Sequence, residues 1–220
     1  MTVCIPVVES NIDDCIKFAE SALKVGDIVE FRLDFIKDKI REEDIVRLSK
    51  YPSIITVRPK WEGGNFEGDD SYRLKILKWA IKNNVKYIDV ELREGKNKDL
   101  VEYRDDVKSK TKIIISHHDF EKTPPKDELY NIVEEELKIG DIGKFATMVN
   151  KKEDILNILN TTLKYSNRVI GIGMGGLGKI TRIIGLDFGS VLTFASLGKS
   201  SAPGQIDTIR LKEIRKLING

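Results

Sequence analysis

Short apolar runs alternate with segments of helical periodicity along this 220-residue chain, and this alternation constrains its fold more than any other feature. The apolar runs are dense in Val, Ile, Phe and Thr, and most of them do not alternate with polar residues. Such composition is typical of parallel strands that are buried on both faces. Eight runs are predicted to be strands: 3–8, 28–35, 54–57, 87–92, 112–116, 142–149, 168–174 and 191–197.

Amphipathic segments fill the intervals between these strands. Their apolar residues recur every three or four positions, as expected for a helix with one buried face. The clearest stripes are Ile12, Ile16, Ala19 and Leu23; Leu74, Leu77 and Ile81; and Ile155, Leu156, Leu159 and Leu163. Helix start signals precede three of the segments, namely Ser10 or Asn11, Asp69-Asp70-Ser71 and Pro124-Pro125.

A strand followed by a helix, eight times without a change in composition, predicts a single-domain (β/α)8 TIM barrel over residues 1–220. The alternative is a doubly wound open sheet, which rarely contains eight such regular units. In a (β/α)8 barrel the chemistry lies at the carboxyl ends of the strands. We therefore expect functional side chains there and in the loops that follow.

Composition excludes several classes of function. The net charge of +2 argues against nucleic acid or an anionic membrane as a partner. No apolar run approaches the roughly 20 residues needed to cross a bilayer. The first residues lack a basic segment and lead into a strand pattern, so we expect no signal peptide and a cytoplasmic protein. Cys4 and Cys15 match no metal-ligand spacing, and we expect buried thiols.

Polar residues follow the predicted strands where a barrel would need them. They are Glu30 and Arg32 on the second strand, Arg58 on the third, Glu91 and Arg93 on the fourth, and His117 and His118 on the fifth. Loops 61–65 and 198–205 are rich in glycine and small residues, which makes them candidate lids.

Lys144 lies within the predicted strand 142–149 and has two interpretations. Its side chain either extends to solvent from the strand start or points into the barrel on the same face as Ala146 and Met148. In the second case burial can lower a lysine pKa by up to roughly 3–5 units. The neutral amine could then condense with a ketone or aldehyde.

His117 and His118 point to opposite faces of the strand if both belong to it. Only one can face the barrel mouth, and periodicity does not tell which. A single histidine at a strand end is more often a hydrogen-bonding core residue than a catalyst. An interior lysine on the next strand favours the catalytic interpretation.

Three arginines and two glycine patterns also have more than one interpretation. Arg32, Arg58 and Arg182 could each form surface ion pairs, but together they indicate a clamp for a carboxylate or phosphate. The glycine patterns at 171–176 and 173–179 resemble nucleotide-binding motifs. The first lacks an acidic ribose ligand downstream, and the second has Ile180 where Mg²⁺ needs a hydroxyl. No cluster has metal-ligand spacing, so we expect no metal.

Many short motifs, in order, resemble the type I 3-dehydroquinate dehydratase family, the Schiff-base enzymes of the shikimate pathway. They are Glu30-Phe31-Arg32-Leu33-Asp34, Thr56-Val57-Arg58, Glu62-Gly63-Gly64, Asp89-Val90-Glu91-Leu92, Ser116-His117-His118-Asp119-Phe120, Lys144, Thr181-Arg182 and Ser201-Ala202-Pro203-Gly204-Gln205. The resemblance runs nearly end to end. On the first strand, where some members have a serine contact, this chain has Cys4-Ile5-Pro6-Val7.

The resemblance implies a role for each matching residue. Lys144 corresponds to the Schiff-base lysine, His118 to the proton-transfer residue and Glu62 to the acid that orients this histidine. Glu30, Arg32 and Arg58 correspond to groups around the ring hydroxyls and the reacting centre, and Arg182, Ser201 and Gln205 to the set that binds the substrate carboxylate.

The resemblance also implies the reaction and the state of the protein. The substrate would be 3-dehydroquinate, converted without a cofactor to 3-dehydroshikimate by a homodimeric enzyme. Two rival functions are a Schiff-base aldolase on the same barrel and a catalytically silent barrel that binds metabolites. Assays with dehydroquinate and with phosphorylated ketoses distinguish the three.

Overall fold

The computed structural model describes residues 2–198 and 204–219. In this part of the chain eight strands form one parallel sheet in the order β7-β6-β5-β4-β3-β2-β1-β8. The strands are β1 (Val3–Val7), β2 (Ile28–Arg32), β3 (Ser53–Thr56), β4 (Tyr87–Glu91), β5 (Lys112–Asp119), β6 (Ile142–Met148), β7 (Val169–Met174) and β8 (Thr193–Phe194). An isolated parallel bridge between Val169 and Ser190 joins β7 to the segment before β8 and nearly closes the barrel.

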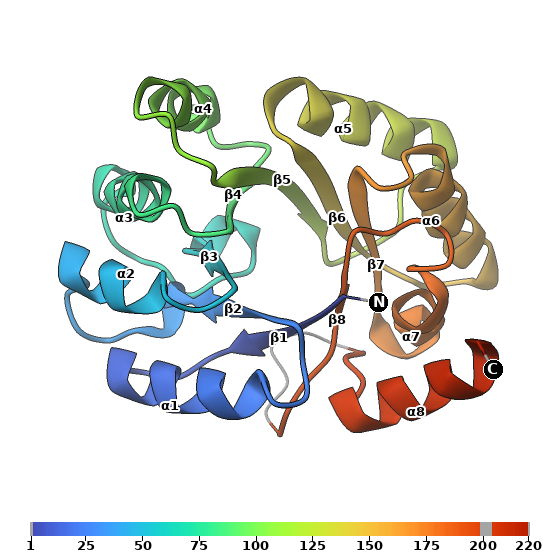
Figure 1. Cartoon of the computed structure of the whole chain (residues 1–220). Coiled ribbons are helices and arrows are strands. Elements are labelled where there is room, and N and C mark those ends of the chain that lie inside the picture. Colours follow the sequence, from blue (N-terminus) through green and yellow to red (C-terminus); the bar gives the residue numbers. More distant parts are fainter. Residues whose placement is uncertain (1, 199–203, 220) are drawn as a thin grey trace.

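The helices surround this ring of strands, as Figure 1 shows. They are α1 (Ile12–Ala22), α2 (Glu42–Leu48), α3 (Asp70–Lys82), α4 (Asn97–Asp106), α5 (Lys126–Ile139), α6 (Lys152–Lys164), α7 (Gly175–Ile184) and α8 (Thr208–Asn219), with short 3₁₀ turns η1 (Leu33–Phe35) and η2 (Lys60–Glu62). The predicted (β/α)8 barrel is confirmed, and the doubly wound alternative is wrong.

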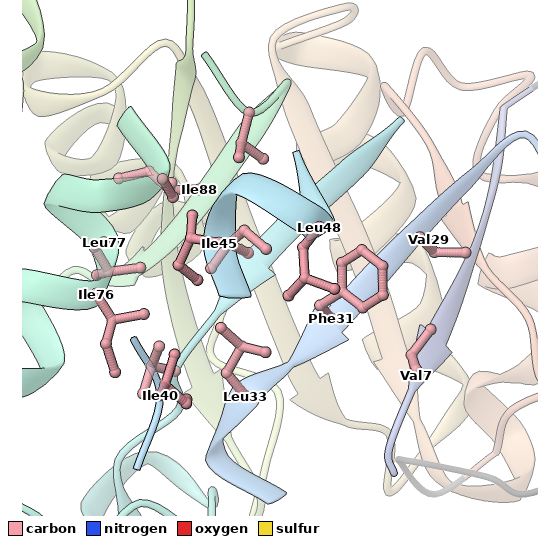
Figure 2. Packing of buried hydrophobic residues seen from close by; sticks show 14 of the residues in the cluster. Val7, Val29, Phe31, Leu33, Ile40, Ile45, Leu48, Ile76, Leu77 and Ile88 are labelled. Atoms are coloured by element: carbon pink, nitrogen blue, oxygen red, sulfur yellow. The ribbon is translucent and has the colours of Figure 1, made fainter. Parts of the chain in front are cut away.

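Each strand contributes to two apolar layers because successive side chains alternate between its faces. On β2, Ile28 lies in the cluster inside the barrel, whereas Val29 and Phe31 belong to the outer cluster under the helices. Figure 2 shows Phe31 facing Leu48 of α2. Burial on both faces explains why the strands lack a polar alternation.

The helix start signals act as the sequence predicts at two positions. The side chain of Asn11 accepts a hydrogen bond from the Asp14 amide at the start of α1. Asp69 accepts one from the Ser71 amide at the start of α3. These bonds satisfy amides that have no partner within the first helical turn.

Three strands differ from the prediction by more than one residue at an end. β2 ends at Arg32 because residues 33–35 turn into η1. β8 is only two residues long. β5 continues to Asp119, because His117, His118 and Asp119 pair with β6.

The predicted stripe of α6 is partly wrong. Leu156 and Leu163 are 60% and 55% exposed. Thr161 and Thr162 are buried instead, and their hydroxyls donate to backbone carbonyls one turn earlier in the helix. A count of apolar residues could not identify this face, since the threonines satisfy their polar groups locally.

Candidate functional site

A pocket with about 590 Å³ of empty space, part of it open to solvent, lies at the carboxyl ends of the strands. Eight of the nine residues singled out in the sequence line it: Glu30, Arg32, Arg58, Glu62, His118, Lys144, Arg182 and Gln205. The ninth, Ser201, lies outside the described residues. The structure thus brings together residues that are up to 175 positions apart, from Glu30 to Gln205.

Lys144 points into the barrel and is only 5% exposed, so the interpretation in which it extends to solvent is wrong. Its Nζ atom lies 4.8 Å from the centre of the Phe194 ring. It also donates to Asp89 Oδ2 at 2.6 Å and lies 3.8 Å from Glu30 Oε1. The amine is therefore dry, but it is paired with a carboxylate rather than isolated among apolar groups.

Asp89, on β4, is the residue of this site to which the sequence analysis gave no role. Besides Lys144 it accepts hydrogen bonds from Arg58 Nη2 at 2.6 Å and from Ser116 Oγ at 2.7 Å. Burial alone would raise the pKa of Asp89, but the cations of Arg58 and Lys144 outweigh it and hold that pKa well below its usual range. In the sequence, the signal that could have identified Asp89 was a carboxylate within a buried strand.

Both terminal nitrogens of the Arg58 guanidinium donate hydrogen bonds to other side chains of the protein. Nη1 donates to Glu91 Oε1 at 2.6 Å and to Ser116 Oγ at 2.8 Å, while Nη2 holds Asp89. Burial would lower the pKa of Arg58, but Asp89 and Glu91 outweigh it and raise that pKa. Glu91 in turn accepts a bond from Arg73 of α3 at 2.7 Å. Alternating charges thus link the helix layer to Lys144.

The histidine that faces the pocket is His118. Its backbone amide donates to Glu62 Oε1 at 2.8 Å, and its Nδ1 lies 3.4 Å from the same oxygen. Burial, reinforced by the positive charge of Arg58, lowers the pKa of His118 to about 3. The imidazole is therefore neutral at pH 7 and able to accept a proton.

Glu62 follows β3 in the turn η2 and is almost completely buried. Burial would raise its pKa, but hydrogen bonds from His118 and Arg93 outweigh it and lower the pKa of Glu62 to about 2. Gly63 comes next with φ +75°, and a Cβ atom there would collide with the Phe120 ring. Glycine at this position lets the turn close with Phe120 packed against it.

The three arginines of the predicted clamp have different environments. Arg32 is held by Asp34, which accepts bonds of 2.8 Å from both Nε and Nη2. Arg58 is held by the carboxylates of β4. Arg182, on α7, lines the pocket, as does Gln205, and burial lowers the pKa of Arg182 to about 10. A buried cation of this kind is stabilised by an anionic ligand, which makes Arg182 the best carboxylate-binding candidate of the three.

The glycine patterns at 171–176 and 173–179 have a packing role. A side chain at Gly171 would collide with Thr162 of α6, and one at Gly178 would collide with the Gly173 backbone. The Gly173 amide donates to Thr181 Oγ1 at 2.8 Å. These glycines let α6 and α7 approach β7 closely.

Within residues 2–198 and 204–219, no group of three or more His, Cys, Asp or Glu side chains is placed to hold a metal ion. Over the same ranges no helix is both long and apolar enough to span a bilayer. Cys4 and Cys15 are buried free thiols.

The fold and the site define a (β/α)8 barrel with an enzyme-like pocket of paired charges at the carboxyl ends of its strands. A family model described as type I 3-dehydroquinase matches residues 3–220. The chain belongs to this family.

Two relatives and one crystal structure illustrate the similarity. The chain is 59% identical over 217 residues to a 3-dehydroquinate dehydratase of Methanococcus maripaludis strain C6, covering 98% of this chain and 99% of that protein. It is 59% identical over 218 residues to a protein of the same name from Methanocaldococcus jannaschii, covering 99% of each. The crystal structure of 3-dehydroquinate dehydratase from Geobacillus kaustophilus superposes with a TM-score of 0.90 at 28% identity, covering 99% of this chain and 91% of that one.

Proposed function

We propose that this protein is a 3-dehydroquinate dehydratase, a carbon–oxygen hydro-lyase of the shikimate pathway that works through a Schiff base on Lys144. The observation that carries the proposal is the placement of Lys144 and His118. The two side chains come from adjacent strands and line one pocket, one as a buried amine and the other as a neutral imidazole. The family and the names of the relatives support the choice of substrate.

The first step joins the enzyme to the substrate ketone. After losing its proton, the Lys144 amine attacks C3 of 3-dehydroquinate, and the C3 oxygen leaves as water to give an iminium ion. Asp89, 2.6 Å from Nζ, is placed to stabilise the positive charge on that nitrogen. The iminium withdraws electrons more strongly than the ketone and acidifies the neighbouring C2 proton.

The second step is the elimination itself. His118 takes the C2 proton, and an enamine forms. The hydroxyl on C1 then leaves as water, with the proton returned by the same imidazole. One base acting on both positions requires loss from a single face, a syn elimination. Glu62, 3.4 Å from Nδ1, stabilises the imidazolium that forms between these events. Water finally hydrolyses the imine and frees Lys144.

The other residues hold the substrate. Arg182 and Gln205, together with Ser201, are assigned to its carboxylate, and Glu30 and Arg32 to its ring hydroxyls. Arg58 borders the reacting centre, and its bonds to Asp89 and Glu91 indicate that its main contribution is to fix these carboxylates. No step uses a cofactor.

A direct assay tests the proposal. Purified protein mixed with 3-dehydroquinate is expected to produce the absorbance of a conjugated enone, and Lys144→Met is expected to produce none above background. Turnover of a phosphorylated ketose instead would favour an aldolase. Binding of dehydroquinate without turnover would identify a silent barrel.

A homodimeric state and a cytoplasmic location complete the proposal. The homodimer is supported by the family resemblance, and the cytoplasmic location by the proposed biosynthetic reaction. Light scattering on the purified protein distinguishes a dimer of this 25.0 kDa chain from a monomer.

A further inference from the structure

Arg93 follows β4, and its side chain contacts Trp61 and Glu62 of the turn η2 beside the pocket. Its Nη2 and Nε atoms donate to Glu62 Oε2 at 2.7 and 3.2 Å. Nη2 also lies 3.3 Å from the Trp61 carbonyl, and the guanidinium lies 5.3 Å from the centre of the Trp61 ring. The backbone and the indole of one residue therefore fix the guanidinium, although the Arg93 side chain is 59% exposed.

The two oxygens of Glu62 have separate partners. Oε1 accepts from the His118 amide and faces the His118 ring, whereas Oε2 is occupied by Arg93. Rotation of the carboxylate would break both sets of bonds. The orientation of the His118 ring thus depends on Arg93, although Arg93 is absent from the residues that line the pocket.

We propose that Arg93 is a positioning residue for the dehydration, which acts on His118 through Glu62. It holds the carboxylate in register with the imidazole and compensates part of its negative charge. The inference rests on the proposed function, since it requires His118 to be the base. No contact between Arg93 and substrate is part of it.

The charges around His118 give the direction of the effect. Arg58 and Lys144 disfavour the imidazolium, whereas Glu62 and Asp89 favour it. On the outer side, the charges of Glu62, Asp119, Arg93 and Glu128 act on His117 instead. Without Arg93, the carboxylate of Glu62 favours the imidazolium more strongly, so His118 should take up its proton at higher pH.

The test compares Arg93→Gln with Arg93→Lys. For Arg93→Gln we expect kcat to fall about fivefold with KM changed less than about twofold, because an exposed charge acts through one buried carboxylate. The acidic limb of kcat should move up by about half a pH unit. Arg93→Lys should recover most of kcat. Arg47→Gln is the matched control, since Arg47 of α2 is a half-exposed arginine paired with Asp13 of α1 and is absent from the pocket lining.

A second background shows whether the effect passes through Glu62. In Glu62→Gln protein, the further change Arg93→Gln should have no effect on kcat. An effect of the same size in that background, a change confined to KM, or a wild-type profile for Arg93→Gln would each overturn the inference.

An activity-independent measurement separates this inference from the proposed function. The chain has two histidines, and their imidazole signals can be titrated by NMR. Arg93→Gln should raise the titration point of His118 only when Glu62 is present. Wild-type protein without dehydratase activity would contradict the proposed function, whereas an unmoved titration point would contradict the role of Arg93.

Discussion

The two halves of the pocket wall differ in how they treat charge. On the side of β3 to β6, cations and carboxylates pair with one another inside the protein: Arg58 with Asp89 and Glu91, Lys144 with Asp89, and Glu62 with Arg93. On the side of β7 and β8 the lining is apolar, from Ile172, Met174 and Phe194, beside the buried cation of Arg182.

This difference indicates that the side of β3 to β6 fixes the reacting groups, whereas the side of β7 and β8 binds the substrate. Reacting groups must be held in one geometry through the reaction, which paired charges provide. On the binding side, burial lowers the pKa of Arg182, and a carboxylate of the substrate would stabilise its charged form. We expect substitutions in the paired half to reduce kcat and those in the apolar half to raise KM.

The largest expected effect comes from His118. His118→Ala should lower kcat by about 10³- to 10⁴-fold, because the reaction loses its general acid and base. His117→Ala is the matched control, since the side chain of His117 is absent from the pocket lining. The reverse ranking in steady-state assays would mean that the wrong ring was chosen.

The next largest effect is expected from Asp89, the carboxylate shared by two cations of the paired half. Asp89→Asn should lower kcat about 100-fold, because the charge facing Lys144 and Arg58 is lost. It should also lower the free energy of unfolding by about 3 kcal/mol, since buried cations lose their partner. Ser116→Ala removes a neutral hydrogen bond from the same network and should cost about 1 kcal/mol. Equal losses in denaturant titrations would deny a special role to the charge.

The opposite half is tested by Arg182→Ala. Its KM should rise about 30-fold while kcat stays within about threefold, because a charge-assisted contact to the substrate carboxylate is lost in ground and transition states alike. An unchanged KM would remove Arg182 from the binding wall. A fall confined to kcat would contradict the expectation that the apolar half acts on binding and the paired half on catalysis.

The smallest effect concerns stability at acid pH. Because the pKa of Glu62 is lowered to about 2, its contribution to stability is complete above its unfolded-state pKa near 4.5 and is lost as the pH falls towards 2. Acid unfolding of wild-type protein should therefore be steeper between pH 4.5 and 2 than that of Glu62→Gln, by about 2 kcal/mol in total. Parallel curves from calorimetry would show that Glu62 titrates normally.

The sequence allowed the barrel and most of the pocket to be predicted, because buried parallel strands and strand-end polar residues leave local patterns. The sequence did not tell whether the Lys144 side chain points into the barrel or to solvent, because this depends on the limits of the strand. Periodicity likewise did not tell which histidine faces the pocket. The family resemblance identified His118.

The partners of these residues could not be predicted, because they are contacts between distant segments. Glu62 and Arg93 are 31 positions apart, and Lys144 and Asp89 are 55 apart. A local pattern shows that Asp89 is a charged residue in an apolar strand, but not which cations surround it. For the same reason the sequence offered burial of Lys144 as one of two interpretations but gave no sign of its carboxylate partner Asp89.

The most direct test of the covalent mechanism is reduction with borohydride during turnover. Protein incubated with 3-dehydroquinate and borohydride is then digested and its peptides are analysed by mass spectrometry. The account predicts a stable adduct on Lys144, absent without substrate and absent in Lys144→Met. An adduct on another lysine, or none in an active enzyme, would contradict the Schiff base at this position.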